Sequence, residues 1–74
     1  MAYTVTSEAV GLAIGPMAET ASRVHEALRK ARQMYDAGFA NVCITDQAGH
    51  KIDGEELLEC IEGKKKITKD LRAV

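Results

Sequence analysis

The stretch from Ala27 to Glu56 constrains the fold of this chain more than any other part of it. Apolar side chains recur there at helical spacing as far as Tyr35, which predicts one buried helix face. Gly38 is placed to end the helix in the left-handed conformation, with Phe39 folding back on Met34. The segment therefore predicts a helix that stops at Gly38 and leads directly into further structure.

A hairpin and a second helix are expected to follow. Aliphatic residues alternate with small ones from Val42 to Thr45, the period of a strand, and 50–52 is the predicted returning strand. The loop 46–49 has the Asp and the Gly of a short turn. Asp53 and Glu56 have the spacing of a reciprocal capping pair, and Gly63 is the predicted end of the helix that they begin.

The N-terminal third is expected to add strands and the start of the long helix. Tyr3–Thr6 alternates and is rich in β-branched residues, so it is a predicted strand. Val10, Leu12 and Ile14 also alternate, which predicts either a second strand after a tight connection at 7–9 or, given the interleaved glycines, a loop.

The long helix is expected to start soon after Pro16, which suits a first helical turn. Helical spacing begins at Met17 and Ala21, although Thr20 or Ser22 as N-cap would leave 16–19 as a loop.

The predicted class is α+β, with a small antiparallel sheet carrying two helices on one face in the order β-(β)-α-β-β-α. The 74 residues suffice for one domain, placed at 1–63 with a basic C-terminal tail at 64–74. That tail is expected to extend a helix through Ile67, Leu71 and Val74 or to be frayed. With three aromatic residues and no Trp the core is thin, which favours self-association.

Composition favours a cytoplasmic protein. Apolar residues make up 46% of the chain and charged residues 28%, as in soluble domains. Neither a secretory leader nor an apolar run of membrane-spanning length is recognisable. Cys43 and Cys60 lie on separate predicted elements and are expected to be reduced thiols.

The residues predict no catalytic, cofactor or metal site. Cys43, Cys60, His25 and His50 lack the close spacing of zinc ligands, and neither Cys is at a helix N-terminus that would favour a thiolate. An acid–base cluster of His50 with Asp46 and Asp53 is the one catalytic alternative. The turn and capping roles of those aspartates make it the lesser interpretation.

Two surfaces are candidates for binding. The first is the sheet face turned away from the helices, where small uncharged side chains would let another backbone or sheet approach closely. Its predicted partner-binding residues are Thr4, Thr6, Ala13, Cys43 and Thr45. The second is the basic tail, which would attract nucleic-acid phosphates through Lys64, Lys65, Lys66, Lys69 and Arg72. A plain solvated face and a solubilising tail are the competing interpretations.

The segment Glu26–Glu56 resembles a group of short bacterial proteins of unassigned role. In that group a helix ending in Gly-Phe, here Gly38-Phe39, leads into a Val-x-Ile-x-Asp strand, here Val42–Asp46, and a glycine hairpin, here at Gly49. The shared residues have capping, turn and core roles, so the resemblance implies a fold and assigns no functional position.

The sequence thus predicts a small non-enzymatic binding or accessory protein that contacts protein, including a second copy of itself, through its sheet face. The alternative is a nucleic-acid-associated protein that uses the basic tail. No cofactor and no membrane contact are expected.

Overall fold

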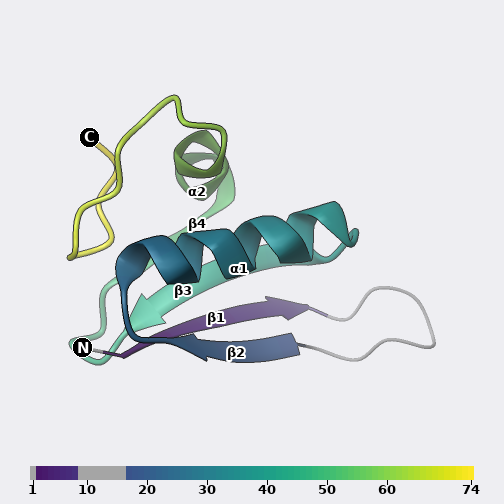
Figure 1. Ribbon diagram of the computed structural model, residues 1–74, viewed down its shortest axis with the longest axis horizontal. Helices are drawn as coiled ribbons and strands as arrows, with labels where there is room; N and C mark the ends of the chain where they lie inside the picture. Colours follow the sequence, from purple (N-terminus) through teal and green to yellow (C-terminus); the bar gives the residue numbers. More distant parts are fainter. Residues whose placement is uncertain (1, 9–16) are drawn as a thin grey trace.

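The computed structural model describes residues 2–8 and 17–74, which form a four-stranded antiparallel sheet and two helices (Figure 1). The elements are β1 (Tyr3–Glu8), β2 (Met17–Ala21), α1 (Val24–Asp36), β3 (Ala40–Asp46), β4 (Lys51–Asp53) and α2 (Gly54–Ile61). The strand order in the sheet is β2-β1-β3-β4. The α+β class and the order of elements are therefore as predicted. Neither helix has the length and apolar character to cross a bilayer, within the residues described.

Strand β1 is longer than predicted, and its partner lies elsewhere in the sequence. Ser7 and Glu8 belong to β1 rather than to a tight connection. The neighbouring strand is β2, in which Met17 pairs with Ser7 and Ala21 with Tyr3. The strand or loop predicted at Val10–Ile14, and Pro16 as the first turn of a helix, lie outside the described residues.

The long helix begins at Val24, so a start at Met17 is wrong. Met17 and Ala21 have helical spacing, but the hydrogen bonds available from β1 hold them in a strand instead. The N-cap is Arg23, not Thr20 or Ser22, and it makes no side-chain capping bond. The tertiary pairing thus overrides the local helical pattern.

Gly38 ends α1 as predicted, with a φ of 89°. The Gly38 amide donates to the Tyr35 carbonyl and the Phe39 amide to the Met34 carbonyl, both at 3.0 Å. These two bonds define the Schellman motif, which satisfies carbonyls that the helix itself leaves free. The same motif ends α2 at Gly63, and Phe39 packs against the core beside β3.

The hairpin between β3 and β4 is as predicted, but the capping pair is not formed. Gly49 has a φ of 92°, and its amide donates to the Asp46 carbonyl at 3.3 Å. Asp53 is the N-cap of α2, yet its carboxylate makes no capping bond and instead faces Lys51 at 3.5 Å. The chain enters α2 through Gly54 at a φ of 59°. This entry leaves Asp53 in β4, paired with Cys43 of β3.

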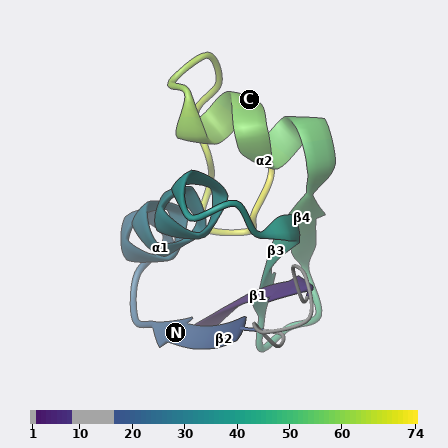
Figure 2. The same ribbon diagram turned by 90° about the vertical axis from the view of Figure 1, so that its right-hand side faces the viewer.

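Both helices pack on the same face of the sheet, and the strands curve around α1 (Figure 2). Val5, Val42 and Ile44 from β1 and β3 are fully buried beneath Ala27 and Ala31 of α1. The full core is Tyr3, Val5, Ala21, Ala27, Ala31, Met34, Val42, Ile44, Ile52, Leu57, Cys60 and Leu71. Small alanines on α1 let the helix lie close to the sheet, which suits a core with few aromatic residues.

The C-terminal residues 64–74 return to the body of the protein and form no helix. Leu71 is buried at a φ of 61°, and Tyr3 donates its hydroxyl to the Lys69 carbonyl at 2.8 Å. Lys66 and Val74 exchange backbone hydrogen bonds and close a loop around these contacts. The segment therefore seals one end of the core beside the N-terminal end of α1 (Figure 1).

Candidate functional site

The face of the sheet opposite the helices carries small side chains in two rows across all four strands. Strand pairing aligns Thr20, Thr4, Thr45 and Lys51 in one row, and Ala18, Thr6, Cys43 and Asp53 in the other. Because side chains alternate along each strand, their neighbours point to the helix side of the sheet, where those of β1, β3 and β4 are buried. We call the six uncharged residues the open face: Thr4, Thr6, Ala18, Thr20, Cys43 and Thr45.

No described helix covers the open face (Figure 2). Thr4, Ala18 and Thr20 are exposed, whereas Thr6, Cys43 and Thr45 on the central strands are half-buried. Charged side chains lie at two edges of the face: Lys51 and Asp53 of β4 form an exposed ion pair, and Glu8 follows Thr6 at the end of β1. The centre of this face therefore presents methyl, hydroxyl and thiol groups without charge.

Four of the five predicted partner-binding residues lie together on this face. They are Thr4, Thr6, Cys43 and Thr45, and Ala13 lies outside the described residues. Ala18 and Thr20 also belong to the face but were missed, because their segment has helical spacing. The sequence signal for a strand there was the alternation of Ala18 and Thr20 with Met17 and Glu19, which spans only four residues.

The two thiols occupy different environments and are both unpaired. The Cys43 sulfur lies 3.0 Å from the Thr6 hydroxyl oxygen across the β1–β3 pair. Cys60 is buried in α2, where desolvation, with the nearby Glu59 carboxylate, raises the pKa of its thiol. Cys60 is thus a core residue, and only Cys43 contributes a thiol to the open face.

A β-bulge distorts the sheet at one end of the open face. The register between β1 and β3 shifts between Thr6 and Glu8, and Asn41 has a φ of 53°. The Asn41 amide nitrogen donates to Glu8 Oε2 at 2.7 Å, which ties the two strands together across the bulge. Bulges and left-handed non-glycine residues are enriched at binding sites.

A pocket of about 720 Å³ opens beside this bulge. Its volume exceeds those of three other pockets on the described residues, which are about 220, 120 and 280 Å³. Its lining combines open-face residues with the bulge and with residues from α1 and the start of α2: Thr6, Ser7, Glu8, Tyr35, Asn41, Cys43, Lys51, Asp53 and Gly54.

The charged groups of this pocket are two carboxylates, at Glu8 and Asp53, and one ammonium group, at Lys51. Glu8 has no cationic partner within 4 Å among the residues described, and Lys51 is engaged by Asp53. Burial, with the carboxylate of Asp53 and then Cys43, raises the pKa of the Tyr35 phenol, which keeps it neutral. The Ser7 hydroxyl is buried and has no hydrogen-bond partner in the described structure.

Of the predicted acid–base cluster of His50 with Asp46 and Asp53, only His50 and Asp46 lie together in the structure. Asp46 is buried, and its Oδ1 and Oδ2 accept from the backbone amide and ring Nδ1 of His50, each at 2.8 Å. Desolvation opposes ionisation of Asp46, but the His50 bonds and the His50 charge outweigh it and lower the pKa of the carboxyl. Asp53 does not join them, since it faces Lys51. The pair closes a turn, and each carboxylate oxygen of the buried Asp46 already accepts one hydrogen bond.

The candidate metal ligands stay apart. Within residues 2–8 and 17–74 no three His, Cys, Asp or Glu side chains gather as a metal ion requires. The two cysteines and two histidines therefore form no metal centre in this part of the chain.

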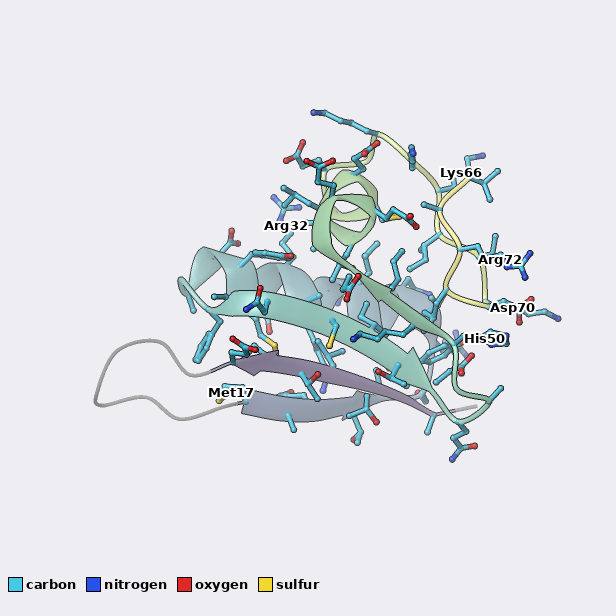
Figure 3. The ribbon with its side chains drawn as sticks, turned by 180° about the vertical axis from the view of Figure 1, so that it is seen from behind. Met17, Arg32, His50, Lys66, Asp70 and Arg72 are labelled. Carbon is cyan, nitrogen blue, oxygen red and sulfur yellow. The ribbon has the colours of Figure 1, made fainter. Side chains whose placement is uncertain are left out.

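Some basic residues of the C-terminal segment form ion pairs in the described structure, and others do not. Lys64 binds Glu62 at 3.0 Å and Lys65 lies 3.5 Å from Glu59. Lys66, Lys69 and Arg72 have no carboxylate within 4 Å among the described residues. Lys66 and Arg72 lie at the end of the molecule that carries His50, away from Met17 (Figure 3).

Comparison with protein-family models, with curated proteins and with solved structures gave no match. The functional interpretation therefore rests on the geometry of the open face and the pocket.

Proposed function

We propose that this protein is a non-catalytic binding or accessory protein that uses its open face to contact protein, and that a second copy of the chain is the principal partner. The observation that carries the proposal is the array of six small uncharged side chains on a sheet face that no described helix covers. Sheets that stack face to face approach to about 10 Å, which small side chains permit and long charged ones resist.

The thin core supports the same proposal. A chain of 74 residues buries only roughly 60% of its unfolded surface, so covering a second sheet face adds appreciable apolar burial. The methyl groups of Thr4, Thr6, Thr20 and Thr45 supply apolar area, and their hydroxyls can pair across an interface. A reducing, cytoplasmic setting fits this proposal, because Cys43 on the contact face would stay a free thiol.

Sedimentation velocity of the intact chain tests the proposal. We expect a dimer for the natural sequence and a monomer for the double variant Thr6→Lys/Thr45→Lys, because two like charges per copy would meet at the interface. Gln47→Lys in the exposed hairpin loop is the matched control and should leave the dimer intact. Circular dichroism verifies that each variant retains the fold.

If the natural chain sediments as a monomer at all concentrations up to about 100 µM, the self-association proposal is rejected, because an interface with a micromolar Kd would form a dimer there. If the double variant is still a dimer, the interface lies on another surface.

The nucleic-acid alternative rests on Lys66, Lys69 and Arg72, the basic residues of the C-terminal segment that form no ion pair in the described structure. Binding to mixed DNA or RNA that weakens steeply with added salt would favour it over the sheet-face proposal. The ion pairs of Lys64 and Lys65 reduce the charge available for phosphates and make it the second candidate.

A further inference from the structure

The pocket beside the β1–β3 bulge has the features of a site for a small ligand. It is concave, it lies where strand pairing is interrupted, and it collects side chains from β1, β3, β4 and α1. Small-molecule sites combine such a concavity with a few fixed polar groups on a mixed apolar wall. Here Tyr35, the Thr6 methyl and Cys43 supply the apolar wall.

One polar group in the wall is held in a defined position. The bond of 2.7 Å from Asn41 to Glu8 Oε2 fixes the Glu8 carboxylate and leaves Oε1 without a described partner. Asn41 maintains this bond from a left-handed conformation with a φ of 53°. Asn tolerates this conformation better than most residues, and the bond to Glu8 helps to hold Asn41 in it.

A second polar group in the wall is unsatisfied. Ser7 is 5% exposed, lines the pocket, and has a buried hydroxyl oxygen without a partner in the described structure. A buried hydroxyl that lacks a hydrogen bond is unfavourable, and such groups are uncommon in native proteins. Because this oxygen is inaccessible to solvent, a ligand in the pocket would reach it only after a movement of the pocket wall.

The charge of the lining determines which ligand fits. Glu8 and Asp53 are acidic, Lys51 is basic and faces Asp53 at 3.5 Å, and no other charged residue lines the pocket. The pocket thus carries one uncompensated negative charge at Glu8, together with the hydroxyls of Ser7 and Tyr35. We propose that it binds a protonated alkylamine or guanidinium group, with Glu8 as its counter-ion and the Tyr35 hydroxyl as a hydrogen-bond acceptor.

The cation would also lie close to an aromatic ring. Tyr35 is partly buried and lines the same pocket, and a cation within about 6 Å of an aromatic face gains further attraction. The raised pKa of the Tyr35 phenol keeps this group neutral, so it accepts from the ligand and adds no charge. This binding needs no second copy of the chain, although Thr6 and Cys43 belong to both the pocket wall and the open face.

The test is a titration of the intact protein with n-butylamine and with n-butylguanidine, followed by amide chemical shifts. We expect saturable shifts at residues 6–8, 41–43 and 53–54, and no saturable shifts with n-butanol or pentanoate, which have the same butyl chain without the positive charge. Equal binding of n-butanol, or no saturable shift with either cation, would overturn the proposal.

The variant Glu8→Gln separates the charge of Glu8 from its structural role. Glutamine retains a carbonyl oxygen that can accept from Asn41, so the bulge is preserved while the counter-ion is lost. We expect its affinity for n-butylamine to fall about tenfold, the scale of one charge-assisted hydrogen bond. Glu55→Gln, an exposed residue outside the pocket, is the matched control and should bind as the natural chain does. Unchanged affinity in Glu8→Gln would overturn the assignment of the counter-ion.

Two further experiments identify the source of the cation and separate amine binding from dimer formation. Blocked Gly-Lys-Gly and Gly-Arg-Gly peptides that bind more tightly than the free amines would place the cation on a protein side chain, whereas weaker binding would indicate a free metabolite. The variant Gln47→Lys/Glu8→Gln should bind n-butylamine about tenfold more weakly, as Glu8→Gln does, and keep the oligomeric state of Gln47→Lys. A loss of amine binding therefore remains distinguishable from a failure of the sheet-face proposal.

Discussion

At the scale of single residues, the Asp46 carboxylate is a buried charged group with two hydrogen bonds from one neighbour. Both of its oxygens accept hydrogen bonds from His50, one from the backbone and one from the ring. It is buried although it is ionised, and these bonds compensate the loss of hydration. The turn between β3 and β4 thus depends on a specific charged side chain as well as on Gly49.

Acid should weaken this contribution. Because the pKa of Asp46 is lower in the folded than in the unfolded chain, ionised Asp46 stabilises the fold above the unfolded value. That stability is lost as the pH falls below about 4, towards the folded pKa. We expect Asp46→Asn to lower the melting temperature at pH 7 and to flatten its decline between pH 5 and 3. Thermal melts of both chains across this range test it.

Asp70→Asn is the matched control for loss of one negative charge, since Asp70 is exposed and has no side-chain partner in the described structure. A melting temperature of Asp46→Asn that declines with acid as steeply as that of the natural chain would assign the acid sensitivity to other groups.

At the scale of elements, the ends of the two helices are defined by glycines in the left-handed conformation. Gly38 and Gly63 have φ values of 89° and 81°, and the amide that follows each donates back into the last helical turn. A Cβ at Gly38 would meet no atom within 4 Å. The cost of a side chain there is therefore conformational and not steric.

Gly38→Ala should destabilise the protein by about 1 kcal/mol, the cost of placing an L-residue in the left-handed region. For a domain of this size that corresponds to a fall in melting temperature of roughly 4–8 °C. Gly38→Asn should cost less, because Asn tolerates this conformation better. Urea denaturation of the three chains measures the difference, and equal stability of Gly38→Ala and the natural chain would contradict the assigned role.

At the scale of the whole molecule, the C-terminal segment completes the core. Leu71 adds a buried aliphatic side chain, and the Tyr3 hydroxyl binds the Lys69 carbonyl over a separation of 66 residues. Ile67 and Ala73 pair across the segment and pack against the same core. The first strand and the last residues of the chain therefore stabilise each other.

Leu71→Ala should lower the free energy of unfolding by about 2–3 kcal/mol, since it removes a buried leucine side chain. Amides of Lys66, Thr68 and Val74, which are hydrogen-bonded within the segment, should then exchange faster with solvent. Val74→Ala, at a side chain that is 77% exposed, is the control and should change neither quantity. Equal exchange rates in Leu71→Ala and the natural chain would show that Leu71 does not anchor the segment.

The sequence predicted only the central part of the open face. The alternation of Thr4 and Thr6 with Val5, and of Cys43 and Thr45 with Val42 and Ile44, was enough to place these residues on one side. Ala18 and Thr20 were not recognised, because the spacing of Met17 and Ala21 suits a helix as well as a strand. The pocket had no sequence signal, since it depends on a register shift between β1 and β3.

Features that depend only on neighbouring residues could be predicted before the fold was known. The stops at Gly38 and Gly63, the turn at Gly49 and the buried faces of α1 and β3 follow from conformational preferences and side-chain spacing within a few positions. The tertiary structure alone decided that Met17–Ala21 is a strand, that Leu71 enters the core, and that Ser7, Glu8 and Asn41 meet beside a pocket. These outcomes depend on hydrogen bonds and apolar contacts between distant segments, whose free energies exceed the local preferences that they override.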